Sequence, residues 1–392
     1  MLTPTKVDCP KQFIEFFAGI GLVRCALEPS GWECRYANDF DPKKQQQYEA
    51  RFGKEHFHLG DIFEADEVAD RVPDSVTLAT ASFPCVDLSL AGHWKGIDGK
   101  HSSAVFGFLE CVRRMHPPQM LLLENVVGLL SSKGGEDFVK LAKSLSQLGY
   151  WLDAFQLDAS YFVPQSRPRV FIVGLHDGAI ERTELARSTD DFVLGASWEN
   201  QIRMHPSIRP NRLVQLMVNT ELSTGWFCSG ISTPIQMNPS RLVDVIDLGD
   251  DQDWWDEAQV RKHYDMMHDR HREQIDQFLR EGAFFVGTIF RRKRDGRMRA
   301  EVRFDGVAGC LRTPKGGSAK QIVITTRGGV LRMRWMSPRE YARLQGADDF
   351  PLVGTTNQQL FGFGDAVCVP VIKWIDDRVL TPIAASLEPV RR

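Results

Sequence analysis

Short apolar runs alternate with amphipathic stretches along residues 12–175 of the chain. Apolar runs of about four to eight residues between turn residues indicate strands, and apolar positions three and four apart indicate helices. Strands are expected at residues 12–17, 33–38, 56–59, 76–81, 120–123 and 169–175. Helices are expected at residues 22–28, 42–52, 104–115 and 136–148. This order predicts an α/β fold with a doubly wound, mostly parallel sheet that helices cover on both faces.

The alternation stops near residue 180 and returns after residue 335. The stretch between them mixes polar segments, tryptophan pairs and blocks of charge. After it, a helix is expected over Pro338–Leu344, with Ser337 as its N-cap and Gly346 as its stop. The apolar residues 367–375 are expected to end the ordered core.

Length and composition exclude several classes of protein. A chain of 392 residues suggests two or three domains. Hydrophobic residues make up 43% and charged residues 25%, which excludes disordered, collagen-like and coiled-coil chains. The longest apolar stretch, residues 120–130, is interrupted by Glu124 and Asn125, so no transmembrane helix is expected. No apolar secretory segment is visible at the N-terminus, and we expect a cytoplasmic protein.

The net charge of −3 hides a strong separation of charge along the chain. Residues 180–279 hold 10 Lys and Arg against 17 Asp and Glu, a balance of −7. Residues 280–334 hold 14 against 4, a balance of +10. The basic stretch, which includes Arg291, Arg292 and Arg294, is followed by a glycine-rich turn at residues 313–321. Either it is a solvated face, or it contacts the phosphates of a nucleic acid.

The eight cysteines stand apart from one another, and no C-x-x-C pair occurs. A zinc ribbon and a disulfide framework are therefore not expected. The plain interpretation is reduced thiols that behave as small buried hydrophobic side chains.

In an open α/β sheet, ligands bind at the carboxyl ends of the strands, so the residues that follow each strand matter most. A glycine-rich turn, Phe17-Ala18-Gly19-Ile20-Gly21, follows the first strand and opens a helix. Its glycines allow a ligand close to the backbone, although tight packing of strand on helix explains them equally well. Asp39-Phe40 follows the second strand and Asp61-Ile62 the third. Together these acids, which singly could be N-caps, describe an adenosine pocket flanked by Phe17 and Phe40.

Cys85 follows the strand at 76–81, directly after Pro84. Because Pro84 restricts the backbone at this turn, the thiol is presented where ligands bind. An isolated cysteine is usually a buried hydrophobic residue, and its position keeps a nucleophile open as the alternative.

Glu124 follows four apolar residues at the end of the next strand. An ionisable group at this position is costly unless it is paired or functional. A structural N-cap is the alternative. Gln165, Arg167 and Arg169 precede or begin the last strand. Alternate arginines on a strand point to the same face, where they could hold carboxylates or phosphates or form surface salt bridges.

Six motifs in this order resemble those of the cytosine-C5 DNA methyltransferases. The resemblance covers residues 12–175 and 334–376 and rests on Phe17-Ala18-Gly19-x-Gly21, Pro84-Cys85, Glu124-Asn125-Val126, Gln165-x-Arg167-x-Arg169, Ser337–Gly346 and Gly364–Val371. It implies a Rossmann-like methyltransferase domain formed by residues 1–179 and 334–392, with a smaller target-recognition domain inserted at residues 180–333. It also implies S-adenosylmethionine as the methyl donor.

The resemblance implies a reaction that these residue types can perform. The Cys85 thiolate adds to C6 of a cytosine flipped out of the duplex, so that C5 becomes nucleophilic toward a methyl group. Glu124 hydrogen-bonds N3 and the exocyclic amine, and Arg167 and Arg169 make the surroundings electropositive. The loop at residues 89–103 is expected to close over the base.

The site residues that follow fall into two further sets. The cofactor is expected to contact Phe17, Ala18, Gly19, Gly21, Asp39, Phe40, Asp61, Ile62, Pro84 and Ala366. DNA is expected to contact Ser89, Gln165, Arg291, Arg292, Arg294, Arg312, Lys315, Gly316 and Gly317. The implied partner is double-stranded DNA, bound by a monomer, with a cognate restriction or defence protein as a further possibility; no metal is expected.

Four positions depart from the family pattern. Glu15 stands where the family usually has Asp, and Asp39 where it often has Glu, so both charges are kept. Val86 replaces the usual Gln after the nucleophile. Asp365 replaces the usual Asn, and this extra carboxylate is expected to weaken the binding of a cofactor that itself carries a carboxylate.

Three other functions fit the sequence less well. An RNA cytosine-C5 methyltransferase would carry a Cys-Phe-Thr tripeptide, which this chain lacks. A DNA-binding module without catalysis would not need Cys85 and Glu124. A nicotinamide dehydrogenase would want a third glycine in the first turn. A metal at His263, His268 and His271 is the weakest alternative, because their context favours a polar helix face.

Overall fold

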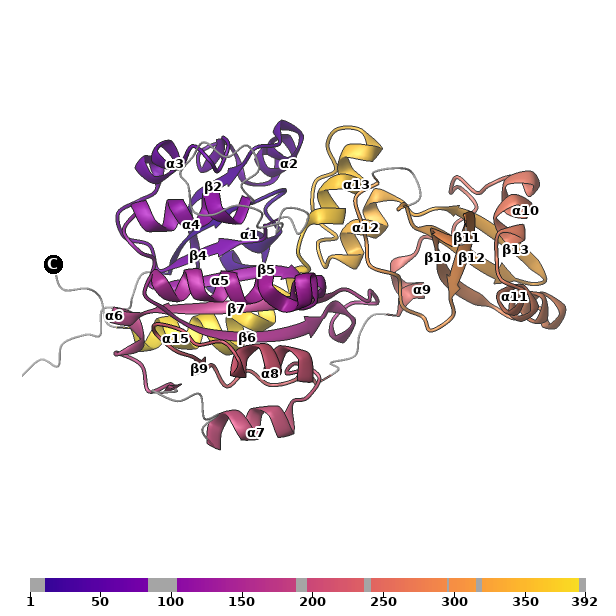
Figure 1. Cartoon of the computed structure of the whole chain (residues 1–392). Coiled ribbons are helices and arrows are strands. Elements are labelled where there is room, and N and C mark those ends of the chain that lie inside the picture. Colours follow the sequence, from indigo (N-terminus) through magenta and orange to yellow (C-terminus); the bar gives the residue numbers. More distant parts are fainter. Residues whose placement is uncertain are drawn as a thin grey trace, which may run out of the picture.

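The computed structural model describes residues 11–83, 104–187, 196–235, 241–294, 296–314 and 319–387. Figure 1 shows a large α/β body and a smaller body beside it, joined through the yellow helices of the C-terminal segment.

The large body is built on a seven-stranded sheet with the order β3-β2-β1-β4-β5-β7-β6. Its strands are β1 (Gln12–Phe16), β2 (Glu33–Asp39), β3 (Phe57–Leu59), β4 (Leu78–Ala81), β5 (Met120–Val126), β6 (Tyr150–Asp158) and β7 (Pro168–His176). The first five run parallel, and β7 is antiparallel to both β5 and β6. The expected doubly wound, mostly parallel sheet is therefore confirmed. Strand β6 was not expected from the sequence pattern.

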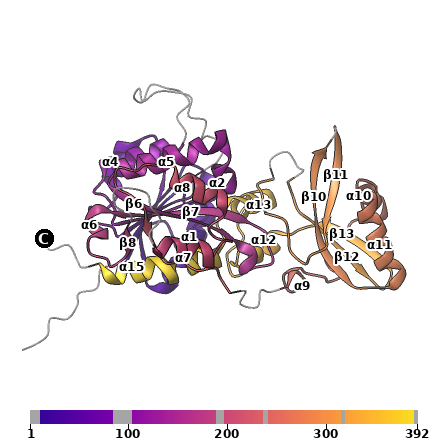
Figure 2. The same ribbon diagram turned by 60° about the horizontal axis from the view of Figure 1, so that its bottom comes forward.

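Neighbouring residues of each central strand enter hydrophobic cores on opposite faces of the sheet, because side chains alternate along a strand. Phe13 and Leu122 belong to one core, while Ile14 and Leu121 belong to the other. Burial on both faces explains why these strands are continuous apolar runs. Figure 2 shows α4 (Ala104–Arg114) and α5 (Glu136–Gln147) over one face and α1 (Leu22–Leu27) on the other. The remaining helices of this half are α2 (Pro42–Phe52), α3 (Ala65–Arg71) and α6 (Asp177–Ile180).

The C-terminal segment completes the large body. It contains α12 (Pro338–Leu344), α13 (Thr356–Asp365), α14 (Val369–Ile375), the π-helical η6 (Asp376–Leu380) and α15 (Thr381–Ser386). The predicted cap is present, since Ser337 and Glu340 form a capping box at the start of α12. The ordered core continues past residue 375, because Trp32 donates to Asp376 at 2.8 Å and Leu387 is buried. The expected end of the core at residue 375 is thus too early.

The smaller body has its own sheet and its own hydrophobic core. An antiparallel sheet of order β11-β10-β12-β13 packs against two helices (Figures 1 and 2). Its elements are α10 (Glu257–Asp265), α11 (Asp269–Glu281), β10 (Phe285–Arg294), β11 (Arg297–Arg303), β12 (Ile322–Arg327) and β13 (Val330–Trp335). Ile275, Ile289 and Met333 lie in its core. The short helix α9 (Leu242–Val245) precedes it and packs in the core of the large body.

Part of the span predicted as the inserted domain, residues 180–333, packs on the large body. It forms β8 (Ala186–Arg187), α7 (Ala196–Met204), α8 (Asn211–Val218) and β9 (Phe227–Cys228). Arg209 and Asp153 of β6 form a fully buried ion pair at 2.6 Å, and Trp226 is buried against Phe138 of α5. Trp254 still packs against the core of the large body, whereas Trp255 packs against the core of the smaller body. No helix was expected in residues 180–235, although α7 and α8 lie there, and a buried ion pair between residues far apart in the chain leaves no periodic signal.

The three histidines weighed as metal ligands have other partners. His263 is buried and stacks on Trp255, so it does not lie on the polar helix face expected for it. His268 caps α11, and His271 Nδ1 accepts from the Val302 amide. Within the described ranges, no group of three or more His, Cys, Asp or Glu is arranged to hold a metal. In those same ranges, no helix combines the length and the apolar character needed to cross a membrane.

Candidate functional site

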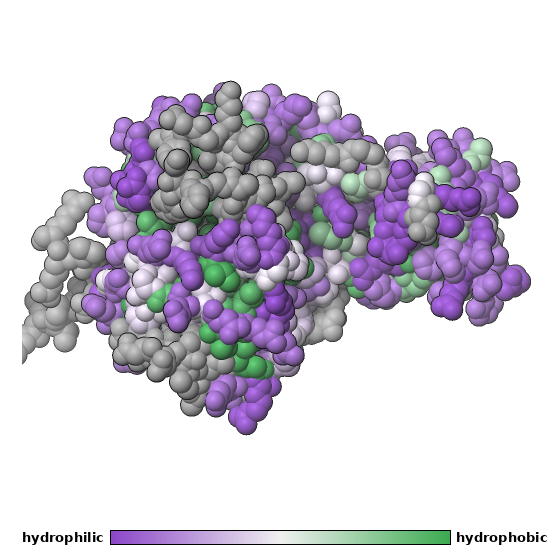
Figure 3. Space-filling model, viewed as in Figure 1, coloured by the Kyte–Doolittle hydropathy of each residue, from purple (hydrophilic) through white to green (hydrophobic). Residues whose placement is uncertain are grey.

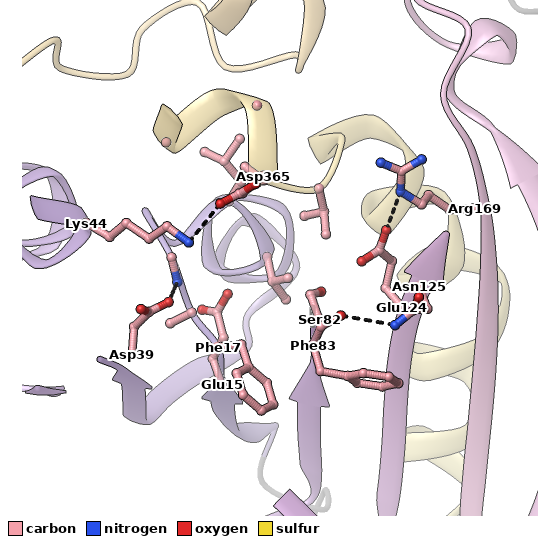
Figure 4. A pocket seen from close by; sticks show the side chains of 18 of the residues that line it. Glu15, Phe17, Asp39, Lys44, Ser82, Phe83, Glu124, Asn125, Arg169 and Asp365 are labelled. Carbon is pink, nitrogen blue, oxygen red and sulfur yellow. Dashed lines mark hydrogen bonds and ion pairs between the residues drawn. The ribbon is translucent and has the colours of Figure 1, made fainter. Parts of the chain in front are cut away.

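A cavity lies at the carboxyl ends of the central strands (Figure 4). Residues that follow or end four strands line it, together with residues from α2, α13 and the segment after α13. Its lining includes Glu15, Phe17, Ala18, Gly19, Asp39, Phe40, Lys44, Ser82, Phe83, Glu124, Asn125, Arg167, Arg169, Asp365 and Ala366. Six of the ten residues expected at the cofactor are in this set.

The glycine-rich turn bends sharply between β1 and α1. Phe17, Gly19 and Gly21 all have positive φ, at 55°, 58° and 84°. Gly21 stands outside the lining and has a packing role, because a Cβ atom there would fall 2.6 Å from Phe52 and 2.8 Å from Tyr48. The turn thus exposes Ala18 and Gly19 to the cavity and uses Gly21 to seat α1 on α2.

Asp39 ties this turn to the end of β2. Its Oδ2 atom accepts from the Gly19 amide at 2.9 Å, and its Oδ1 atom accepts from the Asp41 amide at 3.0 Å. The neighbouring ring of Phe40 is 69% exposed at the edge of the cavity, although a large apolar side chain is usually covered.

Asp61 and Ile62 do not line the cavity. Asp61 is exposed and accepts from the Phe63 amide at 3.1 Å, as in a turn. Ile62 is buried, and its carbonyl accepts from the Cys111 thiol at 3.6 Å. The adjacent Gly60 amide donates to the Asp39 carbonyl at 3.2 Å, so this turn is joined to the end of β2, and a cofactor contact of Asp61 and Ile62 stays a prediction.

Glu15 is a functional candidate that the sequence marks only as a departure from the family pattern. It is 2% exposed, lines the cavity, and its Oε2 atom has no hydrogen-bond partner among the described residues. Burial raises the pKa of Glu15 to about 8, against the opposing effect of Arg24. An acid in the middle of the apolar run Gln12–Phe16 was the signal that could have identified it.

Glu124 and Arg169 face each other across β5 and β7. Their ion pair measures 2.7 Å between Nε and Oε1, with 14% and 11% of the side chains exposed (Figure 4). Burial alone would lower the pKa of Arg169, but the attraction of Glu124 outweighs it and the pKa is raised. Asn125 donates to the Phe83 carbonyl at 3.0 Å and so joins the end of β5 to the end of β4. Glu124 is therefore held in a fixed position at the cavity.

Arg167 also lines the cavity but is used differently. It donates to the carbonyls of Leu311 at 3.0 Å, Gly364 at 3.3 Å and Ala366 at 2.7 Å. These bonds hold the segment after α13 and the segment after β11 against the large body. A Cβ atom on Gly364 would fall 2.6 Å from the Arg312 backbone, so the two segments are in close contact. Within the described residues, Arg167 therefore has a structural role, because its guanidinium is bonded to three backbone carbonyls.

Cys310 lies beside both arginines, and no motif in the sequence marks it. Its Sγ atom is 3.5 Å from Arg167 Nη1 and 3.8 Å from Arg169 Nη2. Burial raises the pKa of a thiol, but here the two arginines prevail and the pKa is lowered. By contrast, burial raises the pKa of Cys25, Cys34, Cys111 and Cys368 to about 12. Proximity to Arg167 and Arg169 in space, which the sequence does not show, makes the difference.

Several expected site residues lie outside the described residues. They are Cys85, Pro84 and Ser89 in one segment and Lys315, Gly316 and Gly317 in another. Phe83 is the last described residue before the first of these segments, and it lines the cavity next to Asn125.

The residues expected to contact DNA have diverse environments. Gln165 is fully buried, donating to the Leu344 carbonyl at 2.7 Å and accepting from the Leu311 amide at 3.1 Å. The expectation that Gln165 touches DNA is therefore not supported, since this side chain joins the large body to α12. Arg312 is exposed.

The expected basic patch lies on the hairpin of β10 and β11. Arg292 and Arg294 both pair with Glu301 of the facing strand, the latter at 3.0 Å. The guanidinium of Arg291 lies over the Trp335 ring at 4.7 Å. Hydrophilic side chains cover most of the smaller body on the face seen in Figure 3. This surface is polar and basic, with part of its charge already neutralised by Glu301.

Comparisons with known proteins agree with this geometry. A family model described as C-5 cytosine-specific DNA methylase matches residues 11–380. The chain is 27% identical to the Type II methyltransferase M.HpaII of Haemophilus parainfluenzae, over 94% of this chain and 88% of that protein. It is also 27% identical to M.HgiCI of Herpetosiphon aurantiacus, over 92% of this chain and 96% of the relative.

Solved structures of DNMT2 proteins share the fold. The Spodoptera frugiperda DNMT2 mutant superposes with a TM-score of 0.57 at 15% identity, covering 95% of this chain and 99% of that one. The S. pombe Dnmt2 methyltransferase gives 0.54 at 16% identity, again over 95% and 99%. The family match spans both the strand ends that form the cavity and the inserted body, and on that basis this chain belongs to the C-5 cytosine-specific DNA methylase family.

Proposed function

We propose that this chain transfers the methyl group of S-adenosylmethionine to C5 of a flipped-out cytosine in a specific duplex DNA site. The observation that carries the proposal is the Glu124–Arg169 pair, which faces the same cavity as the glycine-rich turn and Glu15. One cavity thus holds both a group suited to a cytosine edge and a group of residues suited to a nucleoside cofactor.

The residues of the cavity fit S-adenosylmethionine. The buried Glu15 Oε2 atom lacks a partner among the described residues, and an unsatisfied buried polar atom is costly. The exposed ring of Phe40 offers a stacking surface for a base. Gly19, Asp39 and Phe40 would hold the nucleoside, and the bound cofactor would supply an electrophilic methyl group.

The chain's own residues would activate the cytosine. The Cys85 thiolate forms a bond to C6, which places the electron pair on C5 and allows C5 to take the methyl group. Glu124, positioned by Arg169, hydrogen-bonds N3 and the exocyclic amine and so stabilises the adduct. A proton acceptor then removes the C5 proton, which expels Cys85 and restores the aromatic ring of the cytosine. The base must leave the duplex for this reaction, because a stacked cytosine is inaccessible.

The smaller body would contact the DNA. Its β10–β11 hairpin presents Arg291, Arg292 and Arg294, and basic side chains along one surface suit a phosphate backbone. Its DNA substrate would place the enzyme in the cytoplasm at the nucleoid. A cognate restriction enzyme is the partner that the Type II names of its relatives suggest.

A trapping experiment tests this proposal. The purified chain is incubated with labelled S-adenosylmethionine and duplex DNA, with and without 5-fluorocytosine in place of cytosine. We expect methyl transfer to DNA, and a covalent complex with the fluorinated duplex, which cannot lose a C5 proton. Cys85→Ser is expected to abolish both, whereas Cys111→Ser, a buried thiol on α4, is the matched control.

Three results would contradict the proposal. Methyl transfer by Cys85→Ser would show that Cys85 is not the nucleophile. The absence of a trapped complex would argue against addition at C6. Methylation of an RNA duplex in preference to DNA would show that the substrate is RNA. Bisulfite sequencing of DNA from expressing cells identifies the target site.

A further inference from the structure

Asp365 forms an ion pair inside the candidate cofactor cavity. The sequence predicts a problem at this position, because a carboxylate replaces the usual Asn near a cofactor that carries its own carboxylate. In the structure Asp365 Oδ2 lies 3.1 Å from the Nζ atom of Lys44, and both residues line the cavity (Figure 4). The extra negative charge is therefore matched by a cation from a distant part of the chain.

The pair is held by tight packing of α2 on α13. Gln47 of α2 donates to the Gln358 carbonyl of α13 at 3.2 Å. A Cβ atom on Gly362 would lie 2.7 Å from Gln47 Oε1, so the two helices are in close contact. Because the backbones are fixed, the two charges keep their places at the cavity wall.

Lys44 is the cation with hydrogen-bonding capacity to spare. Three cations line the cavity, and Arg167 and Arg169 are engaged with backbone carbonyls and with Glu124. An ammonium group has three N–H donors, and within the described part of the chain the partner of Lys44 Nζ is Asp365. Only 17% of the Lys44 side chain is exposed, so an anion that reaches it is largely desolvated.

The nearby charges keep Lys44 in its charged form. Burial lowers the pKa of Lys44, but Asp39 and Asp365 outweigh that effect and raise it. The Asp365 side chain is 47% exposed, which leaves it accessible to a second partner.

Resting on the proposed function, we infer that Lys44 and Asp365 together bind the amino-acid end of the cofactor. That end is a zwitterion, with a carboxylate and an ammonium on one carbon. Lys44 donates to the carboxylate and Asp365 accepts from the ammonium, so that two opposite charges of the protein meet two opposite charges of the ligand. Such charge-assisted hydrogen bonds are stronger than neutral ones. The departure at Asp365 is then part of a cofactor contact particular to this chain.

Two adenosine ligands distinguish binding of the amino-acid end by Lys44 and Asp365 from a purely structural role of this ion pair. S-adenosylhomocysteine carries the amino-acid end, whereas 5′-methylthioadenosine has the same nucleoside and an uncharged sulfur without it. Their Kd values are measured by titration calorimetry on the full chain and on Lys44→Met, Asp365→Asn and the double variant. We expect Lys44→Met to weaken S-adenosylhomocysteine roughly 10- to 100-fold and to change 5′-methylthioadenosine less than about twofold.

The double variant gives a second signature. Because Asp365 accepts from the ligand ammonium, Asp365→Asn alone is expected to weaken S-adenosylhomocysteine too, and the loss in the double variant is expected to be smaller than the sum of the two single losses, since the two residues act as one pair. The matched control is Arg51→Met with Asp349→Asn, an ion pair that also joins α2 to the C-terminal segment, at 2.9 Å, but outside the cavity. It is expected to leave both Kd values unchanged.

The outcomes are distinguishable. Equal weakening of both ligands by Lys44→Met would mean that the pair only latches α2 to α13 and would overturn the inference. An unchanged Kd for S-adenosylhomocysteine would overturn it too. If the unmodified chain bound neither ligand, the proposed function itself would fail.

Discussion

At the scale of single residues, the site depends on buried acidic side chains that lie at or near the ends of strands. Glu15, Asp39 and Glu124 are each less than 9% exposed, yet all of them line the cavity. Asp39 has two backbone donors and Glu124 has Arg169, while Glu15 keeps one oxygen without a partner among the described residues. A buried acid with a strongly shifted pKa and an unsatisfied oxygen is typical of functional sites.

Glu15 makes the stability of the unliganded protein depend on pH. Its pKa is about 8 in the folded chain and near 4.5 in the unfolded chain, so between these values the folded state holds a proton that the unfolded state has lost. Stability from this group is therefore lost as the pH rises from about 4.5 to 8. Glu15→Gln is expected to flatten that decline and to be more stable at pH 8 by about 1–3 kcal/mol. Chemical denaturation at pH 5 and pH 8 measures the difference, and an unchanged slope would contradict the assignment.

Glu124 is expected to act on the reacting base more than on the binding of DNA. Glu124→Gln keeps the shape of the side chain but removes the carboxyl group that pairs with Arg169. We expect kcat to fall about 10²- to 10³-fold, as when a positioned stabilising group is lost, with DNA affinity changed much less. Single-turnover rates and DNA-binding titrations separate the two effects. Glu110→Gln, on the outer surface of α4, is the control, and an equal loss of rate and affinity would argue against the role.

At the scale of elements, the basic hairpin of β10 and β11 is partly self-neutralised. Glu301 pairs with both Arg292 and Arg294, so the charge available to phosphate is lower than the sequence balance of +10 for residues 280–334 indicates. Such exposed pairs contribute little to stability, and each can exchange its partner for a phosphate.

Removing Glu301 is therefore expected to strengthen DNA binding. Glu301→Gln frees two arginines and should steepen the dependence of log Kd on log salt by about one, whereas Arg292→Gln should flatten it by up to about one. Anisotropy titrations with a duplex over a series of salt concentrations give both slopes. Asp265→Asn on α10 of the same body is the control, and unchanged slopes in all variants would place the hairpin away from the DNA.

At the scale of the whole molecule, distant segments of the chain are joined by buried polar contacts. Residues 196–231 are tied to β6 by Arg209 and Asp153, and the inserted body is tied to α12 by the buried pair of Arg334 and Glu340. Gln165 donates to the Leu344 carbonyl and joins the start of β7 to the same helix. Of these contacts, the pair of Arg334 and Glu340 joins the smaller body to the large one.

Asp153 is expected to matter for stability far more than an exposed acid. Asp153→Asn leaves the Arg209 guanidinium buried without its charge partner, and breaking a buried pair costs about 3–5 kcal/mol. We expect a clear drop in the midpoint of thermal unfolding, while Arg261→Gln, from an exposed pair on α10, should change it little. Equal effects of the two substitutions would show that the buried pair does not hold residues 196–231 in place.

The sequence by itself determined six of the seven strands of the large sheet, the family motifs and most of the residues at the strand ends, because burial on both faces requires continuous apolar runs and ligands meet strands at their carboxyl ends. It could not determine contacts between residues far apart in the chain. Arg169 reaches Glu124 because β7 runs antiparallel beside β5, and Lys44 reaches Asp365 because α13 packs on α2. Tertiary structure also buried Gln165 and placed Cys310 between two arginines. The physical reason is that a strand or helix is specified by its own periodicity, whereas the partner of a charge depends on which segments the packed core brings together.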